Sequence, residues 1–202
     1  MEPHSDWDKF HLNTFEMIDS LLKVIVKQLN ERLKHTNDTG PENLVELSRF
    51  YLPDGQFNEQ CAEKIVCSVV NIEEERQLKN NRTSAGLITQ PPLQLSLYVL
   101  FAANLKDYHR ALKMTSSVLS FFQSRAVLNH QNSPRLPEEI NKVFFELYTL
   151  TFEQINHLWG SLGTSYMPSA LYKVRLIIDN ENMILEEIPY ITKVELPPDA
   201  EQ

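Results

Sequence analysis

Apolar side chains recur at helical spacing in the first part of the chain. Asn13 and Glu16 form a capping pair, and the residues after them place an apolar stripe along one helix face. The run 36–41, which ends in Gly-Pro, favours turns and cannot continue the helix. The pattern predicts a long helix from Asn13 to His35. Its stripe consists of Ile18, Leu22, Ile25, Leu29 and Leu33.

Strand patterns dominate the next part of the chain. Residues 44–52 are rich in Leu, Val and aromatic side chains and end at a turn over 53–55. Residues 65–72 are apolar on both alternating faces, which is typical of a central strand covered on each side. A polar loop is expected over 77–90. Residues 93–100 alternate cleanly and give the clearest strand pattern of the sequence.

A second helix and several later strands are predicted in the second half. Asp107 is suited to cap a helix over 107–123. The expected apolar stripe of this helix contains Tyr108, Leu112, Val118, Leu119 and Phe122. The remaining elements are a loop over 129–137, a strand over 143–150, a short helix over 152–159 ending at Gly160, and strands over 171–178, 183–188 and 191–196, with a turn at Asp179-Asn180.

These elements favour a single α+β domain without internal repeats. A mixed or antiparallel β-sheet is expected to pack with the long N-terminal helix and the second, central helix. We expect a flexible N-terminal tail over 1–12, the domain over 13–196, and a C-terminal tail over 197–202 that begins with Pro-Pro.

Composition and charge narrow the possible partners. The 202 residues are 42% hydrophobic and 23% charged, which suits one globular domain. The 27 acidic residues outnumber the 19 basic ones, so the net charge is -8. Nucleic acid and anionic membranes attract basic surfaces, so neither is expected as a partner. No secretory signal or membrane-spanning run is seen, which favours a soluble chain made in the cytoplasm.

The sequence lacks the residue spacings of a catalytic or metal site. Its six histidines do not pair at ligand spacing, and no glycine-rich loop precedes Lys-Ser or Lys-Thr. Cys61 and Cys67 are expected to be reduced, buried thiols. We therefore expect no metal, no cofactor and no enzymatic activity. A deep pocket gathering Glu153, His157 and Ser161 would contradict this expectation.

Three consecutive acids, Glu73, Glu74 and Glu75, follow a predicted strand and are followed by Arg76. On a strand, Glu73 and Glu75 share one face and Glu74 lies on the other. Clustered carboxylates can act as acid and base or bind cations, but the sequence has no second cluster to complete such a site. The cluster either protects a sheet edge or contacts a basic partner or a neighbouring subunit.

An aromatic and a thioether side chain stand together at Tyr166 and Met167, in a loop flanked by Gly163 and Ser169. Exposing such groups to water is costly unless another surface covers them. This loop is therefore a second candidate contact.

Six segments in order share the pattern of one known family. They are Ile18-Asp19, 69–76, 95–104, 131–134, 152–160 and 168–175. Read together they resemble the cap, or tail-terminator, proteins of contractile injection systems. In these phage-tail-like particles, a contracting sheath drives an inner tube through a target envelope. The resemblance extends over about residues 17–196.

The resemblance implies a structural, non-enzymatic role. It implies a homo-hexameric ring that ends tube and sheath polymerisation and stabilises the distal end of the particle. The implied partners are further copies of the chain and the sheath and inner-tube proteins. Glu73 to Arg76 with the loop 77–90, and Tyr166 with Met167, are the expected contacts. Assembly in the cytoplasm would precede incorporation into a particle that can be released extracellularly.

Two points remain open at this stage. Relatives of this kind usually begin after residues 1–16 and often continue beyond the position of Gln202, so the contacts that such a further region would make are left open for this chain. The alternative function is that of a baseplate or tube-initiating component of the same type of particle, because a shared fold does not fix the position of a protein.

Overall fold

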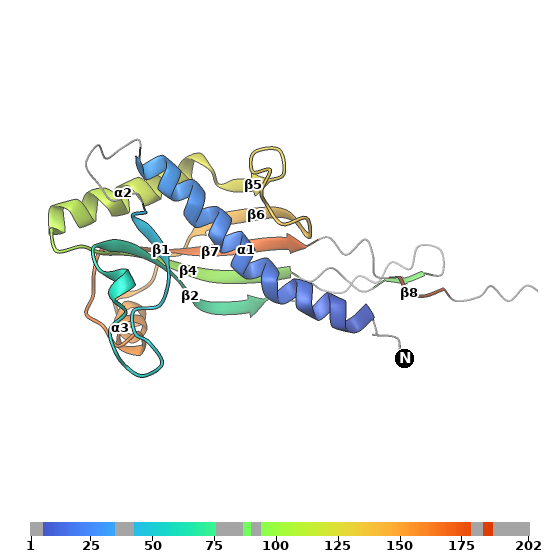
Figure 1. Ribbon diagram of the computed structural model, residues 1–202, viewed down its shortest axis with the longest axis horizontal. Coiled ribbons are helices and arrows are strands. Elements are labelled where there is room, and N and C mark those ends of the chain that lie inside the picture. Colours follow the sequence, from blue (N-terminus) through green and yellow to red (C-terminus); the bar gives the residue numbers. More distant parts are fainter. Residues whose placement is uncertain (1–5, 35–42, 76–86, 90–93, 179–183, 188–202) are drawn as a thin grey trace, which may run out of the picture.

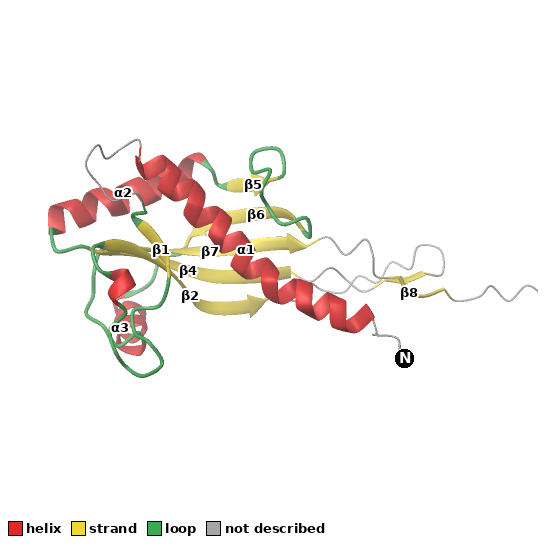
Figure 2. Cartoon of the chain, viewed as in Figure 1, coloured by secondary structure: helices red, strands yellow, loops and turns green. Residues whose placement is uncertain are grey.

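The computed structural model describes residues 6–34, 43–75, 87–89, 94–178 and 184–187. Its centre is a six-stranded sheet in the order β1-β2-β4-β7-β6-β5, with helices on both faces (Figures 1 and 2). The helices are α1 (Asp6–Lys34), α2 (Tyr108–Ser124) and α3 (Phe152–Ser161), with a 3-10 turn at Glu59–Cys61. The strands are β1 (Val45–Leu47), β2 (Lys64–Glu74), β3 (Leu87–Thr89), β4 (Gln94–Asn104), β5 (Val127–Asn129), β6 (Ile140–Leu147), β7 (Ser169–Ile178) and β8 (Ile184–Glu187).

The sheet is mixed, as expected from the sequence. β1 lies parallel to β2, and every other neighbouring pair is antiparallel. β3 and β8 form a separate antiparallel pair. β3 precedes β4 in the chain, and β8 follows β7. The prediction of a single α+β domain with a mixed sheet, a long N-terminal helix and a central helix is confirmed.

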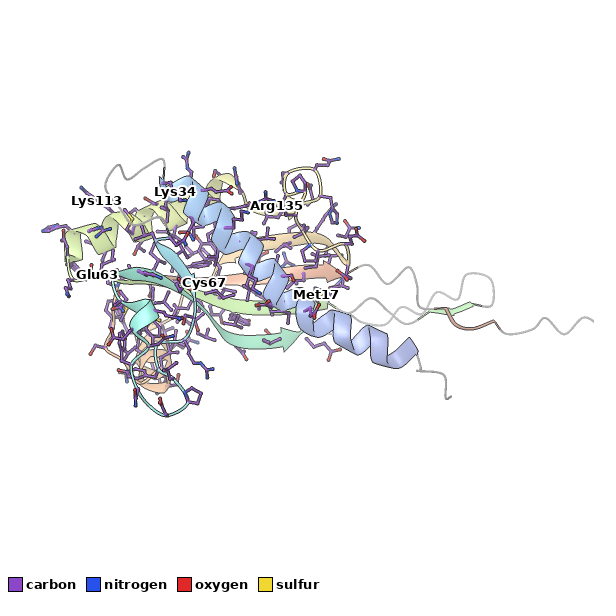
Figure 3. All side chains as sticks on the ribbon, in the orientation of Figure 1. Met17, Lys34, Glu63, Cys67, Lys113 and Arg135 are labelled. Carbon is purple, nitrogen blue, oxygen red and sulfur yellow. The ribbon has the colours of Figure 1, made fainter. Side chains whose placement is uncertain are left out.

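One face of the sheet carries the larger hydrophobic core. α1 crosses this face diagonally and α2 lies beside it (Figure 1). The Phe122 ring of α2 lies 4.5 Å from the ring of Tyr172 on β7 and 4.7 Å from that of Phe145 on β6, measured between centroids. Figure 3 marks Cys67 of β2 within this layer of side chains, where it is fully buried. Burial of these rings and of the α1 stripe fixes both helices to the sheet.

The opposite face is only partly covered. α3 packs Trp159 against Phe50, with 6.1 Å between ring centroids, and the cluster also contains Cys61. Thr151 and Gln154 form a capping box at the start of α3. After its end, Gly163 adopts φ +68°, a conformation that disfavours residues with a Cβ. The rest of this sheet face is not covered by any helix of the described residues, and this open face forms the candidate surface described below.

Two elements begin or end at other residues than the sequence predicted. α1 begins at Asp6 rather than Asn13, so residues 6–12, expected in a flexible tail, are helical. The expected strand over 44–52 forms only as β1, because the chain then leaves the sheet and carries Phe50 into the smaller cluster. The turn that follows does form, with Gly55 at φ +82°.

The apolar stripe of the second helix is also rotated from the predicted one. Tyr108 and Leu112 are exposed, at 61% and 43%. The buried positions are Ala111, Met114, Val118, Phe121 and Phe122. Asp107 caps the helix as predicted, accepting hydrogen bonds from the His109 and Arg110 amides.

Several expectations lie wholly or partly outside the described residues. These are the place of Arg76, most of the loop 77–90, the turn at 179–180, the strand over 191–196 and the tail 197–202. The division of the chain into tails and a domain therefore remains a prediction.

Candidate interaction surface

The open face of the sheet brings two of the predicted acids to one lysine. Lys173 Nζ lies 2.8 Å from Glu75 Oε1 and 4.0 Å from Glu73 Oε2. Glu73, the penultimate residue of β2, lies on the same face as Glu75, as strand alternation predicts. Lys173 lies on β7, which is separated from β2 by β4 alone. Tyr98 of β4 is directly opposite Lys173. The two acids are thus paired within the chain.

Two polar side chains of β4 complete this cluster. The Ser96 hydroxyl is fully buried and donates a 2.8 Å hydrogen bond to Glu75. The Tyr98 hydroxyl donates to Glu73 at 2.8 Å. Lys173 Nζ also lies 5.9 Å from the centroid of the Tyr98 ring, in cation–π geometry. We call the set Glu73, Glu75, Ser96, Tyr98 and Lys173 the charged cluster.

A second ion pair borders the charged cluster on β6 and β7. Arg175 pairs with Glu146, and its guanidinium carbon lies 5.5 Å from the centroid of the Phe144 ring. Phe144 is directly opposite Arg175 in the sheet register. The cations and acids therefore alternate across the open face, so most of the charge on this face is compensated locally.

The electrostatics of the charged cluster have specific causes. Hydrogen bonds from Lys173 and then Ser96 lower the pKa of Glu75. The same contact with Glu75 raises the pKa of Lys173. The hydrogen bond to Glu73 raises the pKa of Tyr98. All three shifts keep the groups in the charge states they have at neutral pH, so the cluster holds the strands together and is not poised for proton transfer.

Glu74 differs from its neighbours. It lies opposite Leu95, on the other face from Glu73 and Glu75, and it is exposed. Among the described residues it takes part in no ion pair. Glu74 is therefore the acid of the predicted trio whose charge is free for a partner.

The aromatic candidate lies on the α3 side of the molecule. Tyr166 is 63% exposed, and its ring packs against Trp159 with 5.8 Å between centroids. Met167 is half-buried and packs against the smaller core. Phe152, at the start of α3, is 92% exposed. Tyr166 and Phe152 are thus the large apolar side chains of this end that water reaches most freely.

The three side chains that an active site on α3 would need do not form a pocket. Glu153, His157 and Ser161 are all exposed, and the Ser161 hydroxyl donates to the Leu158 carbonyl at 2.8 Å. Within the described ranges, no three His, Cys, Asp or Glu side chains gather as metal ligands would. None of the helices in those ranges is both long and apolar enough to cross a membrane.

The sequence did not point to the cations of this surface. Lys173 and Arg175 alternate with apolar residues along β7, which indicated a strand with one polar face. Their pairing with acids more than 25 positions away depends on the strand order and register. The buried Ser96 carries no sequence signal beyond its place in an alternating strand.

A mixed sheet with helices on both faces defines an α+β protein. The family described as "Pvc16 N-terminal domain" matches residues 20–193. The chain therefore belongs to the Pvc16 N-terminal domain family, and the resemblance to caps of contractile injection systems inferred from the sequence is confirmed. A comparison with curated proteins finds no match.

Two solved structures match this chain over most of its length. The structure described as the anti-feeding prophage cap (AFP tube terminating cap) is 18% identical with a TM-score of 0.50, over 84% of this chain and 58% of that one. The PVC sheath/tube terminator in its extended state, from an extracellular contractile injection system, is 15% identical with a TM-score of 0.45, over 88% of this chain and 65% of that one. The chain thus spans less than two thirds of the length of either structure.

Proposed function

We propose that this chain is a subunit of the cap that ends the tube and sheath of a contractile, phage-tail-like injection particle. The observation that carries the proposal is its membership of the Pvc16 N-terminal domain family over residues 20–193. The AFP tube-terminating cap, which has a similar fold, supports the proposal.

The cap acts through its shape and its surfaces. A growing tube continues while each ring offers a surface that the next ring can bind, so a terminator must fit the last ring on one side and offer no equivalent surface on the other. Copies of the chain form a closed ring, expected to be a hexamer, and bind the sheath and inner-tube proteins. Assembly takes place in the cytoplasm, and the cap then stays with the particle when it is released.

The contacts are proposed to include the residues predicted from the sequence. Glu74 and Tyr166 are exposed and free to bind, which supports their role. Glu73 and Glu75 contribute through the charged cluster, and Met167 by supporting the loop that carries Tyr166. Arg76 lies outside the described residues and is proposed on its position in the sequence alone.

The proposed role requires no catalysis and no cofactor. The exposure of Glu153, His157 and Ser161, and the engagement of Glu75 and Lys173 with one another, support a non-enzymatic function.

Deleting the gene and imaging the particles by electron microscopy tests the proposal. Loss of a terminator gives overlong or ragged tubes, and re-expression of the chain restores uniform length. Complete absence of tubes would overturn the proposal in favour of a baseplate or tube-initiating component. A labelled chain should mark the end of the particle farthest from the baseplate.

A further inference from the structure

Both outer strands of the six-stranded sheet are closed by an asparagine side chain. On β1, the amide of Asn30 donates to the Val45 carbonyl at 2.9 Å, and the Val45 amide donates to Asn30 Oδ1 at 2.8 Å. These backbone groups are the ones that an added strand would use. The side chain from α1 therefore closes this edge to pairing.

The opposite edge is closed in the same way. Asn132 donates to the Val127 carbonyl at 2.9 Å, and the Asn129 amide donates to Asn132 Oδ1 at 2.9 Å. The hydrogen bond from Phe145 to the Ala126 carbonyl sets the alternation of β5, so Val127 and Asn129 direct their backbone groups away from β6. Asn132 therefore occupies the outward carbonyl of Val127 and the outward amide of Asn129.

The second half of β2 has no such closure. β1 pairs with β2 only as far as Cys67, so residues 68–74 lack a partner strand on their outer side among the described residues (Figure 2). The Glu75 amide donates to the Gln94 carbonyl at 2.9 Å. By antiparallel alternation, the backbone groups of Glu73 also face β4, whereas those of Ile72 and Glu74 point outward.

The side chains along this open edge combine apolar and acidic character. Ile72 is 52% exposed, and Glu74 is exposed beside it on the same face. Glu73 lies on the other face with about half of its side chain exposed. A purely protective row of charges would not include an exposed isoleucine next to the acids. The edge therefore suits an extended segment with both apolar and basic side chains.

The chain's own surfaces argue against a second copy as the occupant. Pairing two β2 edges would set acids against acids, and like charges on paired strands are destabilising. The outer edges of the six-stranded sheet of a second copy, β1 and β5, are closed by Asn30 and Asn132.

We propose that residues 68–74 of β2 receive an extended strand from a partner protein, with Lys or Arg facing Glu73 and Glu74 and an apolar side chain facing Ile72. Backbone hydrogen bonds would supply affinity and the flanking side chains specificity. The inference rests on the proposed function in one respect: the protein that donates the strand is taken to be a component of the particle.

Two synthetic peptides and one pair of variants test this inference on the purified full chain. One peptide, called the Lys–Val peptide, repeats Lys-Lys-Val, so that two lysines can face Glu73 and Glu74 while a valine faces Ile72. The matched Glu–Val peptide repeats Glu-Glu-Val. In the variant Ile72→Pro the outward N–H is lost, while the ladder to β4 is kept, because an edge strand tolerates proline where its N–H faces solvent. Ile72→Ala removes the same side chain but keeps the N–H and serves as the matched control.

The Lys–Val peptide should bind the unmodified chain about tenfold more tightly than the Glu–Val peptide, because two opposite-charge pairs replace two like-charge pairs. It should slow hydrogen exchange at the amides of Ile72 and Glu74. Ile72→Pro should lose this binding, whereas Ile72→Ala should keep most of it. Glu74→Pro replaces Ile72→Pro if circular dichroism shows that the latter does not fold.

Equal binding of the two peptides, no binding of either, or equal binding by both variants would overturn the inference. Slow hydrogen exchange at the amides of Ile72 and Glu74 in the free chain would also overturn it. Protection that depends on protein concentration would mean that a second copy occupies the edge. Protection that does not depend on concentration would mean that a segment of the same chain occupies it. Peptide binding and hydrogen exchange are measured on the purified chain and do not depend on the tube length in the deletion experiment. The strand-binding inference and the proposed cap function can therefore be contradicted separately.

Discussion

Asn30 and Asn132 make the same pair of hydrogen bonds to an edge strand, but in different surroundings. Asn30 is 7% exposed, whereas Asn132 is exposed to water. The cost of losing a hydrogen bond depends on whether the partner left behind is buried, because water can replace a lost partner only at the surface. The two residues are therefore a matched pair for measuring the value of edge closure.

Asn30→Ala should lower the free energy of unfolding by about 1–3 kcal/mol, because it leaves the buried N–H and C=O of Val45 unpaired. Asn132→Ala should cost less than about 1 kcal/mol, since water can bind the groups it frees. Urea denaturation of both variants measures the difference. Equal losses would show that burial does not control the cost at β1.

The charged cluster should give stability that depends on pH. Because Lys173 and Ser96 lower the pKa of Glu75, the ionised carboxylate stabilises the fold above its ordinary pKa of 4.5. That contribution is lost as the pH falls below this value and through the lowered pKa of the folded state. Glu75→Gln should therefore destabilise the chain near neutral pH, by less than about 1 kcal/mol for a partly exposed ion pair.

The difference between Glu75→Gln and the unmodified chain should stay constant from about pH 7 to about pH 5 and should shrink as the pH falls below 4.5 towards about 3, measured by urea denaturation at each pH. Glu74→Gln removes no ion pair among the described residues and serves as the control. A difference that grew on acidification would contradict the assigned direction of the pKa shift.

At the scale of elements, α2 depends on one aromatic side chain. Phe122 is 2% exposed and lies within about 5 Å of four other rings, those of Phe101, Phe121, Phe145 and Tyr172. Phe122→Ala should lower the free energy of unfolding by about 3–5 kcal/mol, because it removes buried area and leaves a cavity. Phe152→Ala, at a side chain 92% exposed, should change it by less than about 0.5 kcal/mol. Thermal and urea unfolding measure both, and comparable losses would contradict the packing role of Phe122.

Elements with a strong periodic pattern could be predicted from the sequence. The helix over 107–123 was predicted within a residue or two because Asp107 is a good cap. The strand at 93–100 was located because its alternation is regular, but β4 continues to Asn104, beyond the alternating part. The strand at 44–52 was overestimated because Phe50 follows a strand pattern locally but is buried against α3 instead. Local sequence cannot show that competing tertiary contact.

The candidate surface was only half predictable. Alternation correctly placed Glu73 and Glu75 on one face, but their pairing with Lys173 required the order β2-β4-β7. The closure of β1 by Asn30 likewise depends on how α1 lies across the sheet. Contacts between distant segments follow from register and topology, which the spacing of residues along the chain does not encode.

At the scale of the whole molecule, the two faces of the sheet are built differently. The larger core holds α1 and α2 on one face, whereas the smaller cluster on the other joins α3 to the loops around Phe50 and Met167. Elements with fewer buried contacts open at lower free energy than the main core. The α3 side should therefore open locally while α1, α2 and the sheet stay folded.

The two cysteines can measure this difference because each lies in one of the two clusters. Cys61 belongs to the α3 side, with its sulfur 3.2 Å from the Arg49 carbonyl. Cys67 belongs to the larger core, and burial raises its pKa to about 12. A thiol reagent reacts with the thiolate and needs access, so neither cysteine should react until its surroundings open.

In single-cysteine variants, Cys61 in the Cys67→Ala chain should react faster than Cys67 in the Cys61→Ala chain. Its rate should also rise less steeply with urea, because local opening exposes less surface than global unfolding. The rate for Cys67 should follow the global unfolding equilibrium measured by circular dichroism on the same variant. Identical urea dependence at both positions would mean that the two faces unfold as one unit, with the loop and α3 as firmly held as α1 and α2.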